Sequence, residues 1–168
     1  GKWDTNRTPY MKRIYDCLID SSTESVTIKS SAQVGKTEML LNILGRYMHL
    51  DPCSILFVQP TVDDAKAFSK ERVEPMIRDT KVLKKLIKKA NKKAEGTVQG
   101  KMFPGGFVRF VGANSPSGLA SRPIRITLLD EVDRFPDSAK DEGNPVELQK
   151  PEPQHFLIEK CLEYLPNR

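Results

Sequence analysis

Apolar positions along the chain follow two spacings, one typical of helices and one typical of buried strands. Apolar side chains stand at positions 11, 14, 15, 18 and 19, which is the spacing of a helix with one buried face. The short β-branched run at 26–28 predicts a strand. Residues 39–48 are apolar almost all round and end shortly before Asp51 and Pro52, so they predict a buried helix.

A second set of strand and helix signals follows. Residues 54–59 form a continuous apolar run closed by a proline, as in a strand buried on both faces of a parallel sheet. The next helix is expected to be capped near Thr61, and Pro75 predicts a kink or break near its end. Two further runs, 107–111 and 124–129, predict strands. This alternation predicts an α/β fold in which helices flank a largely parallel sheet.

The remaining helical signals differ in character. Residues 81–93 carry seven lysines among apolar side chains at helical spacing, which predicts an amphipathic basic helix. Its lysines fit contact with DNA phosphates, although we favour the interpretation of a solvated face over an apolar stripe. If the charge serves DNA binding, affinity should fall sharply as salt rises. After three prolines, residues 156–165 predict a short helix in the C-terminal tail.

Composition sets the broad class. A chain of 168 residues is long enough for one compact domain with a core. No stretch approaches the roughly 20 apolar residues that a membrane helix needs, so no membrane partner is expected. The chain starts without an apolar signal segment, which predicts a cytosolic location, and without Met, which is typical of a fragment. The net charge of +5 favours a polyanionic partner but also fits an ordinary basic surface.

Cysteine and histidine usage argues against two classes of protein. Cys17, Cys53 and Cys161 are odd in number and lack CxxC spacing, and His49 and His155 stand far apart in the sequence. We therefore expect neither a metal-ligand cluster nor a disulfide framework.

Residues 30–37 match the pattern of a phosphate-binding loop between a strand and a helix. The pattern GxxxxGK[ST] supplies backbone N–H groups for phosphate, a lysine for the β and γ phosphates, and a hydroxyl for magnesium. Ser30 stands in place of the first glycine. The predicted cofactor-binding residues are Ser30, Ser31, Ala32, Gln33, Val34, Gly35, Lys36 and Thr37, with Thr37 also a magnesium ligand. The alternative is an ordinary strand-to-helix turn that contains Gly-Lys-Thr by chance.

A second motif, at 126–131, is a hydrophobic strand that ends in two carboxylates, the Walker B arrangement. Asp130 is predicted to hold the hydrated magnesium ion, and Glu131 to act as the general base that polarises the attacking water. Taken alone, the acidic pair also fits a solvated strand end or a helix cap. Together with the loop at 30–37, it predicts an ATPase that uses ATP and Mg2+.

Two cations lie beside these motifs. Lys29, just before the loop, is either an additional positive charge near the phosphates or a solvent-facing residue at a strand end, and we favour the second. Arg122 lies upstream of the Walker B strand. It is either a guanidinium that stabilises transition-state charge, across a subunit boundary, or a structural arginine.

Several strings, most of them outside the two nucleotide motifs, make the chain similar to the lambda-type (gpA) phage terminase large subunit. They lie at 8–11, 33–38, 58–61, 68–72, 78–80, 103–106, 112–116, 119–125 and 129–134. On this resemblance, residues 8–147 form a terminase-type P-loop ATPase domain, and residues 148–168 form a divergent C-terminal tail.

The resemblance implies a RecA/helicase-like sheet and a motor that drives double-stranded DNA into an empty capsid. It also implies partners, namely a small terminase subunit, the portal of the procapsid and other copies of the chain in a ring, in the cytoplasm of a bacterial host. Lys36, Glu131 and Arg122 would be catalytic, with Arg122 the arginine-finger candidate. Tyr10 would lie near the adenine, although we favour the interpretation of a core tyrosine.

The family's nuclease half and its carboxylate cluster are missing, so this chain is expected to have no nuclease activity. Two other functions stay open. A helicase-like DNA translocase would separate strands, whereas a packaging motor shows DNA-stimulated hydrolysis without strand separation. A catalytically incomplete prophage remnant would bind nucleotide or DNA without turnover, which a single-turnover assay would reveal.

Overall fold

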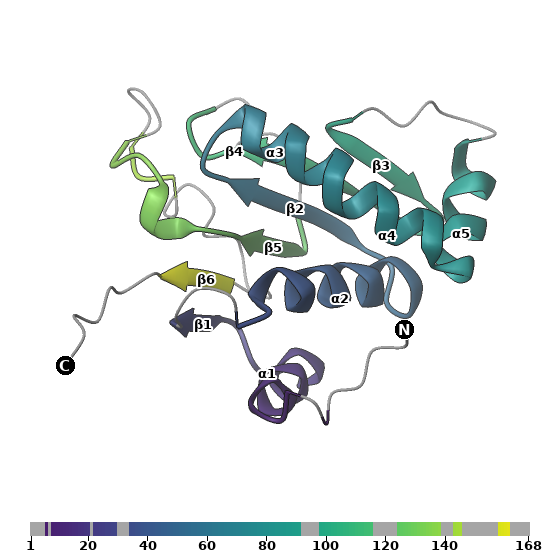
Figure 1. Cartoon of the computed structure of the whole chain (residues 1–168), viewed down its shortest axis with the longest axis horizontal. Coiled ribbons are helices and arrows are strands. Elements are labelled where there is room, and N and C mark those ends of the chain that lie inside the picture. The colour runs from purple at the N-terminus through teal and green to yellow at the C-terminus, as the bar shows by residue number, and fades with distance from the viewer. Residues whose placement is uncertain are drawn as a thin grey trace.

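A four-stranded sheet forms the centre of the part of the chain that the structure describes (Figure 1). The structure is a computed structural model, and it describes residues 6, 8–20, 22–29, 34–91, 98–115, 124–138, 143–145 and 158–161. The strand order is β3-β4-β2-β5. Three strands are parallel, β2 (Ser54–Gln59), β4 (Gly106–Gly112) and β5 (Ile126–Leu129), and β3 (Gly100–Phe103) is antiparallel to β4. The predicted α/β fold with a largely parallel sheet is confirmed.

Both faces of the sheet are covered. Successive side chains of β2 point to opposite faces, and those on each face belong to a buried apolar cluster. Ile55 and Phe57 belong to a large apolar cluster that includes every buried apolar side chain of α2 (Lys36–His49). Leu56 and Val58 belong to a smaller cluster. The continuous apolar run of β2 therefore has the cause that the sequence predicts, which is burial on both faces.

The large cluster is where the helices meet the sheet. The helices are α1 (Tyr10–Ile19), α3 (Val62–Phe68), α4 (Glu74–Asp79) and α5 (Lys81–Asn91), in addition to α2. Each contributes at least one buried side chain to this cluster. In the described part of the chain, no helix is long and apolar enough to cross a membrane.

Pro75 does not break the helical segment as the sequence predicts, because a π-helical turn precedes it. α3 continues directly into the π segment η2 (Ser69–Val73) and then into α4, which has Pro75 in its first turn. A proline cannot donate a backbone hydrogen bond, and in an α-helix its ring would clash with the carbonyl four residues earlier. The wider turn of a π-helix relieves this clash, so the chain continues in nearly the same direction.

The basic helix predicted at 81–93 corresponds to α5. Lys81, Lys84 and Lys85 are exposed, and Leu83 is buried. The expected amphipathic character is confirmed over this stretch, while residues 92 and 93 lie outside the described residues.

The predicted helix at 156–165 is wrong where the structure describes it. Residues Ile158–Cys161 form strand β6, which pairs in parallel with β1 (Val26–Lys29). Helix periodicity is a weak signal in so short a segment, because a helix of a few turns is marginal without tertiary support. Pairing with β1 satisfies backbone groups of both strands, and this tertiary gain decides the outcome.

Candidate functional site

The carboxyl ends of β2 and β5 meet at one edge of the sheet. The two parallel strands are paired up to Val58 and Leu129, so the residues that follow, Gln59 and Asp130, are neighbours. Gln59 Nε2 donates a hydrogen bond of 3.1 Å to Asp130 Oδ2, and the Asp130 backbone N–H donates one of 3.1 Å to the Val58 carbonyl. Asp130 is only 4% exposed. Its carboxylate is thus held by β2 as well as by its own strand.

The N-terminal end of α2 provides the other half of the site. Gly35 precedes α2 with a φ of 81°, a left-handed conformation that glycine adopts without strain. A Cβ at this position would lie 3.0 Å from Met11 Cε, so the packing of α1 favours glycine as well. Lys36 begins the helix and is 6% exposed, and Thr37 follows it.

Part of the predicted site lies outside the described residues. This applies to Ser30, Ser31, Ala32 and Gln33 of the loop and to Arg122. The flanking elements are described, because β1 ends at Lys29 and α2 begins at Lys36. A strand therefore precedes the predicted loop, and a helix follows it.

A cavity of about 230 Å3 lies among the start of α2, the ends of β2 and β5, and the helical segment formed by α3 and η2. It is lined by Thr37, Gln59, Asp64, Ala67, Phe68, Glu71, Arg72, Asp130, Glu131 and Arg134. Thr37 comes from the first sequence motif, and Asp130 and Glu131 come from the second. The fold therefore brings together residues of two motifs that are far apart in the chain.

Glu131 leaves β5 in an unusual backbone conformation. Its φ of 58° is the only positive φ outside glycine among the described residues. It precedes a 3-10 turn, η3 (Val132–Arg134), that carries Arg134 back over it. Arg134 Nη1 donates to Glu131 Oε2 at 2.5 Å, and this hydrogen bond and the carboxylate charge raise the pKa of Arg134.

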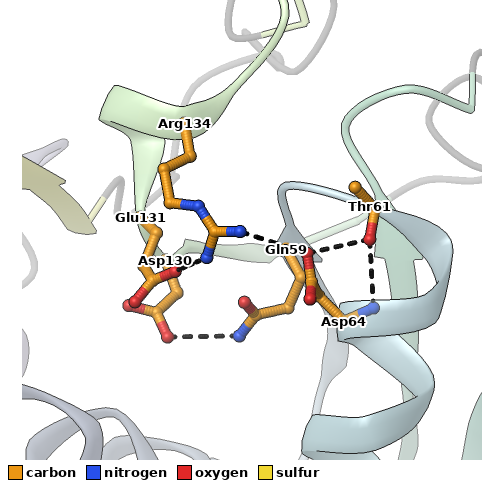
Figure 2. Close-up of polar contacts among 6 residues, drawn as sticks. All are labelled: Gln59, Thr61, Asp64, Asp130, Glu131 and Arg134. Atoms are coloured by element: carbon orange, nitrogen blue, oxygen red, sulfur yellow. Dashed lines mark hydrogen bonds and ion pairs between the residues drawn. The ribbon is translucent and has the colours of Figure 1, made fainter.

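Asp64 lies on the opposite side of Arg134 (Figure 2). Thr61 ends the connection from β2 and caps α3, because the Asp64 backbone N–H donates to Thr61 Oγ1 at 3.1 Å. The same Thr61 hydroxyl donates to Asp64 Oδ2 at 2.8 Å. Arg134 Nη2 lies 4.0 Å from this Asp64 oxygen, so the guanidinium stands between two carboxylates from different elements.

The oxygen atoms that line the cavity suit a magnesium ion that is bound together with a phosphate ligand. The described residues contain no group of three or more His, Cys, Asp and Glu that could hold a metal ion alone. The cavity does offer the Thr37 hydroxyl and the Asp130 carboxylate. Mg2+ prefers oxygen ligands and usually keeps waters and substrate phosphates in addition to one or two carboxylates. Two protein oxygens fit this mode of binding.

Tyr10 and Lys29 can be placed as well. Tyr10 is 57% exposed, so the favoured interpretation of a core tyrosine is wrong. Its hydroxyl donates to the Val34 carbonyl at 3.0 Å, which joins the start of α1 to the end of the predicted loop. Lys29 is exposed at the end of β1, as the favoured alternative predicts.

Three of the residues that line the cavity were not predicted as site residues, although two of them lie in the strings at 58–61 and 129–134 that carry the family resemblance. Gln59, Asp64 and Arg134 belong to no nucleotide-binding pattern in the sequence. Gln59 could have been found, because it ends a buried parallel strand, and ligands bind at the carboxyl ends of such strands. The neighbouring sequence indicates a helix-capping role for Asp64 and an exposed surface charge for Arg134.

Comparison with known proteins gives a consistent set of relatives. The sequence matches the family described as "Phage terminase large subunit gpA, ATPase domain" over residues 1–162. The terminase large subunits of Enterobacteria phage P21 and Escherichia phage lambda are each 29% identical to it, over 148 and 147 residues. These matches cover 86% of this chain and 23% of each relative, so the chain spans about a quarter of the relatives' length.

Solved structures share the fold. The large terminase of bacteriophage HK97 superposes with a TM-score of 0.64 at 13% identity, covering 95% of this chain and 33% of that one. The ATPase domain of the Thermus phage P74-26 large terminase gives 0.51 at 19% identity, covering 84% of this chain and 60% of that one. At these identities the similarity concerns the fold alone.

Proposed function

Because this chain belongs to the family of phage terminase large subunit gpA ATPase domains, we propose that it binds Mg2+–ATP and hydrolyses it in the cavity between α2 and β5. One observation carries this proposal. Thr37, Asp130 and Glu131 line the same cavity, although they come from the ends of different elements. A hydroxyl and a buried carboxylate are groups that hold Mg2+ in P-loop ATPases, and a second carboxylate at the same site can activate the attacking water.

Each residue has a distinct role in the proposal. The backbone N–H groups of residues 30–35 and the N-terminal end of α2 would receive the phosphates, with Lys36 at the β and γ phosphates. Thr37 and Asp130 would hold Mg2+, which neutralises charge on the phosphates when it is bound. Glu131 would polarise the attacking water. Arg122 is proposed as the finger that stabilises transition-state charge, supplied in trans by a neighbouring copy.

Beyond ATP hydrolysis, we propose that the chain is the motor portion of a longer protein that moves double-stranded DNA into a capsid. The support is that its curated relatives are terminase large subunits and that it spans about a quarter of their length. The partners would be DNA, the portal of the procapsid, a small terminase subunit and other copies in a ring. The place of action would be the cytoplasm of the bacterial host.

A nucleotide titration tests the core of this proposal. Lys36→Ala removes the ammonium proposed to reach the phosphates, so the affinity for Mg2+–ATP should fall by roughly 10- to 100-fold, because charge-assisted contacts of this kind contribute about 1.5–3 kcal/mol. Lys12→Ala is a suitable control, since Lys12 is an exposed lysine on α1. Equal affinity of wild type and Lys36→Ala would contradict the proposed site.

Hydrolysis should then be measured with and without double-stranded DNA. Stimulation by DNA without strand separation supports a packaging motor, and strand separation supports a helicase instead. Nucleotide binding with no hydrolysis, even with protein in excess over ATP, would leave only the incomplete remnant.

A further inference from the structure

Arg134 makes two contacts with Glu131. Its guanidinium donates to the Glu131 carboxylate, and its backbone N–H donates to the Glu131 carbonyl at 2.9 Å. Together these contacts close a small loop of chain directly after β5. The direction of the Glu131 side chain is therefore tied to the 3-10 turn η3 as well as to the strand.

The backbone of Glu131 needs such support. A left-handed conformation at a residue with a side chain is disfavoured by contact between Cβ and the backbone. Residues of this kind persist where surrounding contacts determine them, often at functional sites. The two contacts from Arg134 are among those that hold Glu131 in this conformation.

Asp64 faces the other side of the guanidinium, with its Oδ2 4.0 Å from Arg134 Nη2. It is held by Thr61 through two hydrogen bonds, at the point where β2 passes into α3. Arg134 has a planar fork of donors, so it can face two carboxylates at once. Figure 2 shows the guanidinium between Glu131 and Asp64.

The two arginines that line the cavity differ in whether carboxylates compensate their charge. Arg72 also lines the cavity, and among the described residues no hydrogen bond or ion pair involves its guanidinium. The charge of Arg134 is compensated by two carboxylates, which makes it a poor partner for a phosphate. Its position suits the support of an acidic residue instead.

We propose that Arg134 is a positioning residue that holds the Glu131 carboxylate toward the cavity by bridging it to Asp64 on α3. This inference rests on the proposed hydrolysis of ATP at the same site. In this role, Arg134 itself touches no reacting atom during hydrolysis. The bridge also means that the end of β5 and the start of α3 hold the proposed general base jointly.

An unfolding measurement alone would not separate positioning from ordinary packing. The side chains of Arg134 and Glu131 are 55% and 25% exposed, and ion pairs near the surface contribute little to the free energy of unfolding. The bridge should matter far more for the geometry of hydrolysis, where small misplacements of a reacting group are costly.

The test is ATP hydrolysis by the 168-residue chain and its variants. Arg134→Ala is expected to lower kcat by roughly 10- to 100-fold with KM and nucleotide affinity nearly unchanged. Arg134→Lys should restore part of kcat, because an ammonium pairs with Glu131 but lacks the fork that also faces Asp64. Arg78→Ala is the matched control, since Arg78 is an exposed arginine with an acidic partner elsewhere, on α4.

Asp64 provides a second arm. Asp64→Asn keeps an oxygen that can accept from Thr61 but removes the charge that faces Arg134. It should lower kcat less than Arg134→Ala does, and it should have no further effect in the Arg134→Ala background. Full additivity of the two losses, or a rise in KM with unchanged kcat in Arg134→Ala, would overturn the bridge.

The outcomes separate this inference from the proposed function. If Glu131→Gln abolishes hydrolysis while Arg134→Ala behaves as wild type, the positioning role is wrong and the function stands. If Lys36→Ala and Glu131→Gln both hydrolyse ATP as wild type does, the function itself is wrong. If hydrolysis is too slow to follow, a crystal structure of Arg134→Ala decides, since an unchanged φ and side-chain direction at Glu131 would refute the role of Arg134.

Discussion

Two adjacent carboxylates, Asp130 and Glu131, are held in different ways at the end of β5. Asp130 is buried and accepts a hydrogen bond from the Gln59 amide. Glu131 is partly exposed and accepts a hydrogen bond from the Arg134 guanidinium. A buried carboxylate fixed by a neutral donor suits a metal ligand with one orientation. A more accessible carboxylate suits contact with water. The two acids can therefore take two roles although they are neighbours in the chain.

Replacement of Asp130 tests the first of these roles. Asp130→Asn keeps the shape of the side chain and an oxygen for Gln59, so the fold should be retained. Hydrolysis at saturating ATP should fall by roughly 100-fold or more, because a metal ligand stabilises several kcal/mol of transition-state charge. Asp133→Asn, which changes an exposed carboxylate three residues further on, should be close to wild type in a Mg2+ titration of activity. Similar losses in both variants would count against a metal role for Asp130.

Among the elements, β5 is aligned with β2 at its start as well as at its end. Arg125, just before β5, forms two hydrogen bonds of 2.8 Å with the two Asp51 carboxylate oxygens. Its backbone N–H also donates to the Ser54 carbonyl at 3.1 Å. These contacts fix the register that brings Gln59 and Asp130 together at the other end of the strands.

This pairing predicts a pH dependence of stability. The hydrogen bonds from Arg125 lower the pKa of Asp51. A lowered pKa in the folded state contributes stability above the unfolded value of about 3.9, and this contribution is lost as pH falls through the folded value. Both side chains are more than 40% exposed, so Asp51→Asn should cost only about 0.5 kcal/mol at pH 7 and progressively less below pH 4.

Urea unfolding at pH 7 and at pH 3 measures this difference. Asp16→Asn is a control for the change in net charge, because Asp16 is an exposed residue of α1. A cost of Asp51→Asn that stays constant between the two pH values would show that Arg125 does not discriminate between the charged and neutral forms of Asp51.

Across the whole molecule, the C-terminal segment returns to support the site. β6 pairs with β1, and β1 leads directly into the predicted phosphate loop. Figure 1 shows β6 between β1 and β5, and β6 is in contact with both strands. Among the described strands, β6 is thus the element that links the two sides of the proposed nucleotide site.

Truncation tests this link. A chain that ends at residue 157 lacks β6, whereas a chain that ends at residue 161 keeps it. The shorter chain should bind ATP about tenfold more weakly, equivalent to about 1.4 kcal/mol, because β1 loses its paired strand next to the loop. It should also melt at a lower temperature. Equal affinity of the two truncated chains would show that β1 is positioned without β6.

Local signals in the sequence determined the buried strands β2 and β5, the helix that follows Gly35 and the acidic pair after β5. Each depends on a glycine, a charge or a periodicity within a few neighbouring residues. Such signals do not depend on where the segment lies in the fold. The loop pattern and the acidic pair together also predicted that ATP and Mg2+ would be the ligands, which stays a proposal.

Only the tertiary structure decided that residues 158–161 form a strand and that Gln59, Asp64 and Arg134 surround the acidic pair. Gln59 and Asp130 are 71 residues apart, and no local preference of either residue encodes their contact. Contacts between distant segments form because packing of the sheet and helices offsets the entropy of closing long loops. That free energy belongs to the whole folded chain and is not visible in any single segment of it.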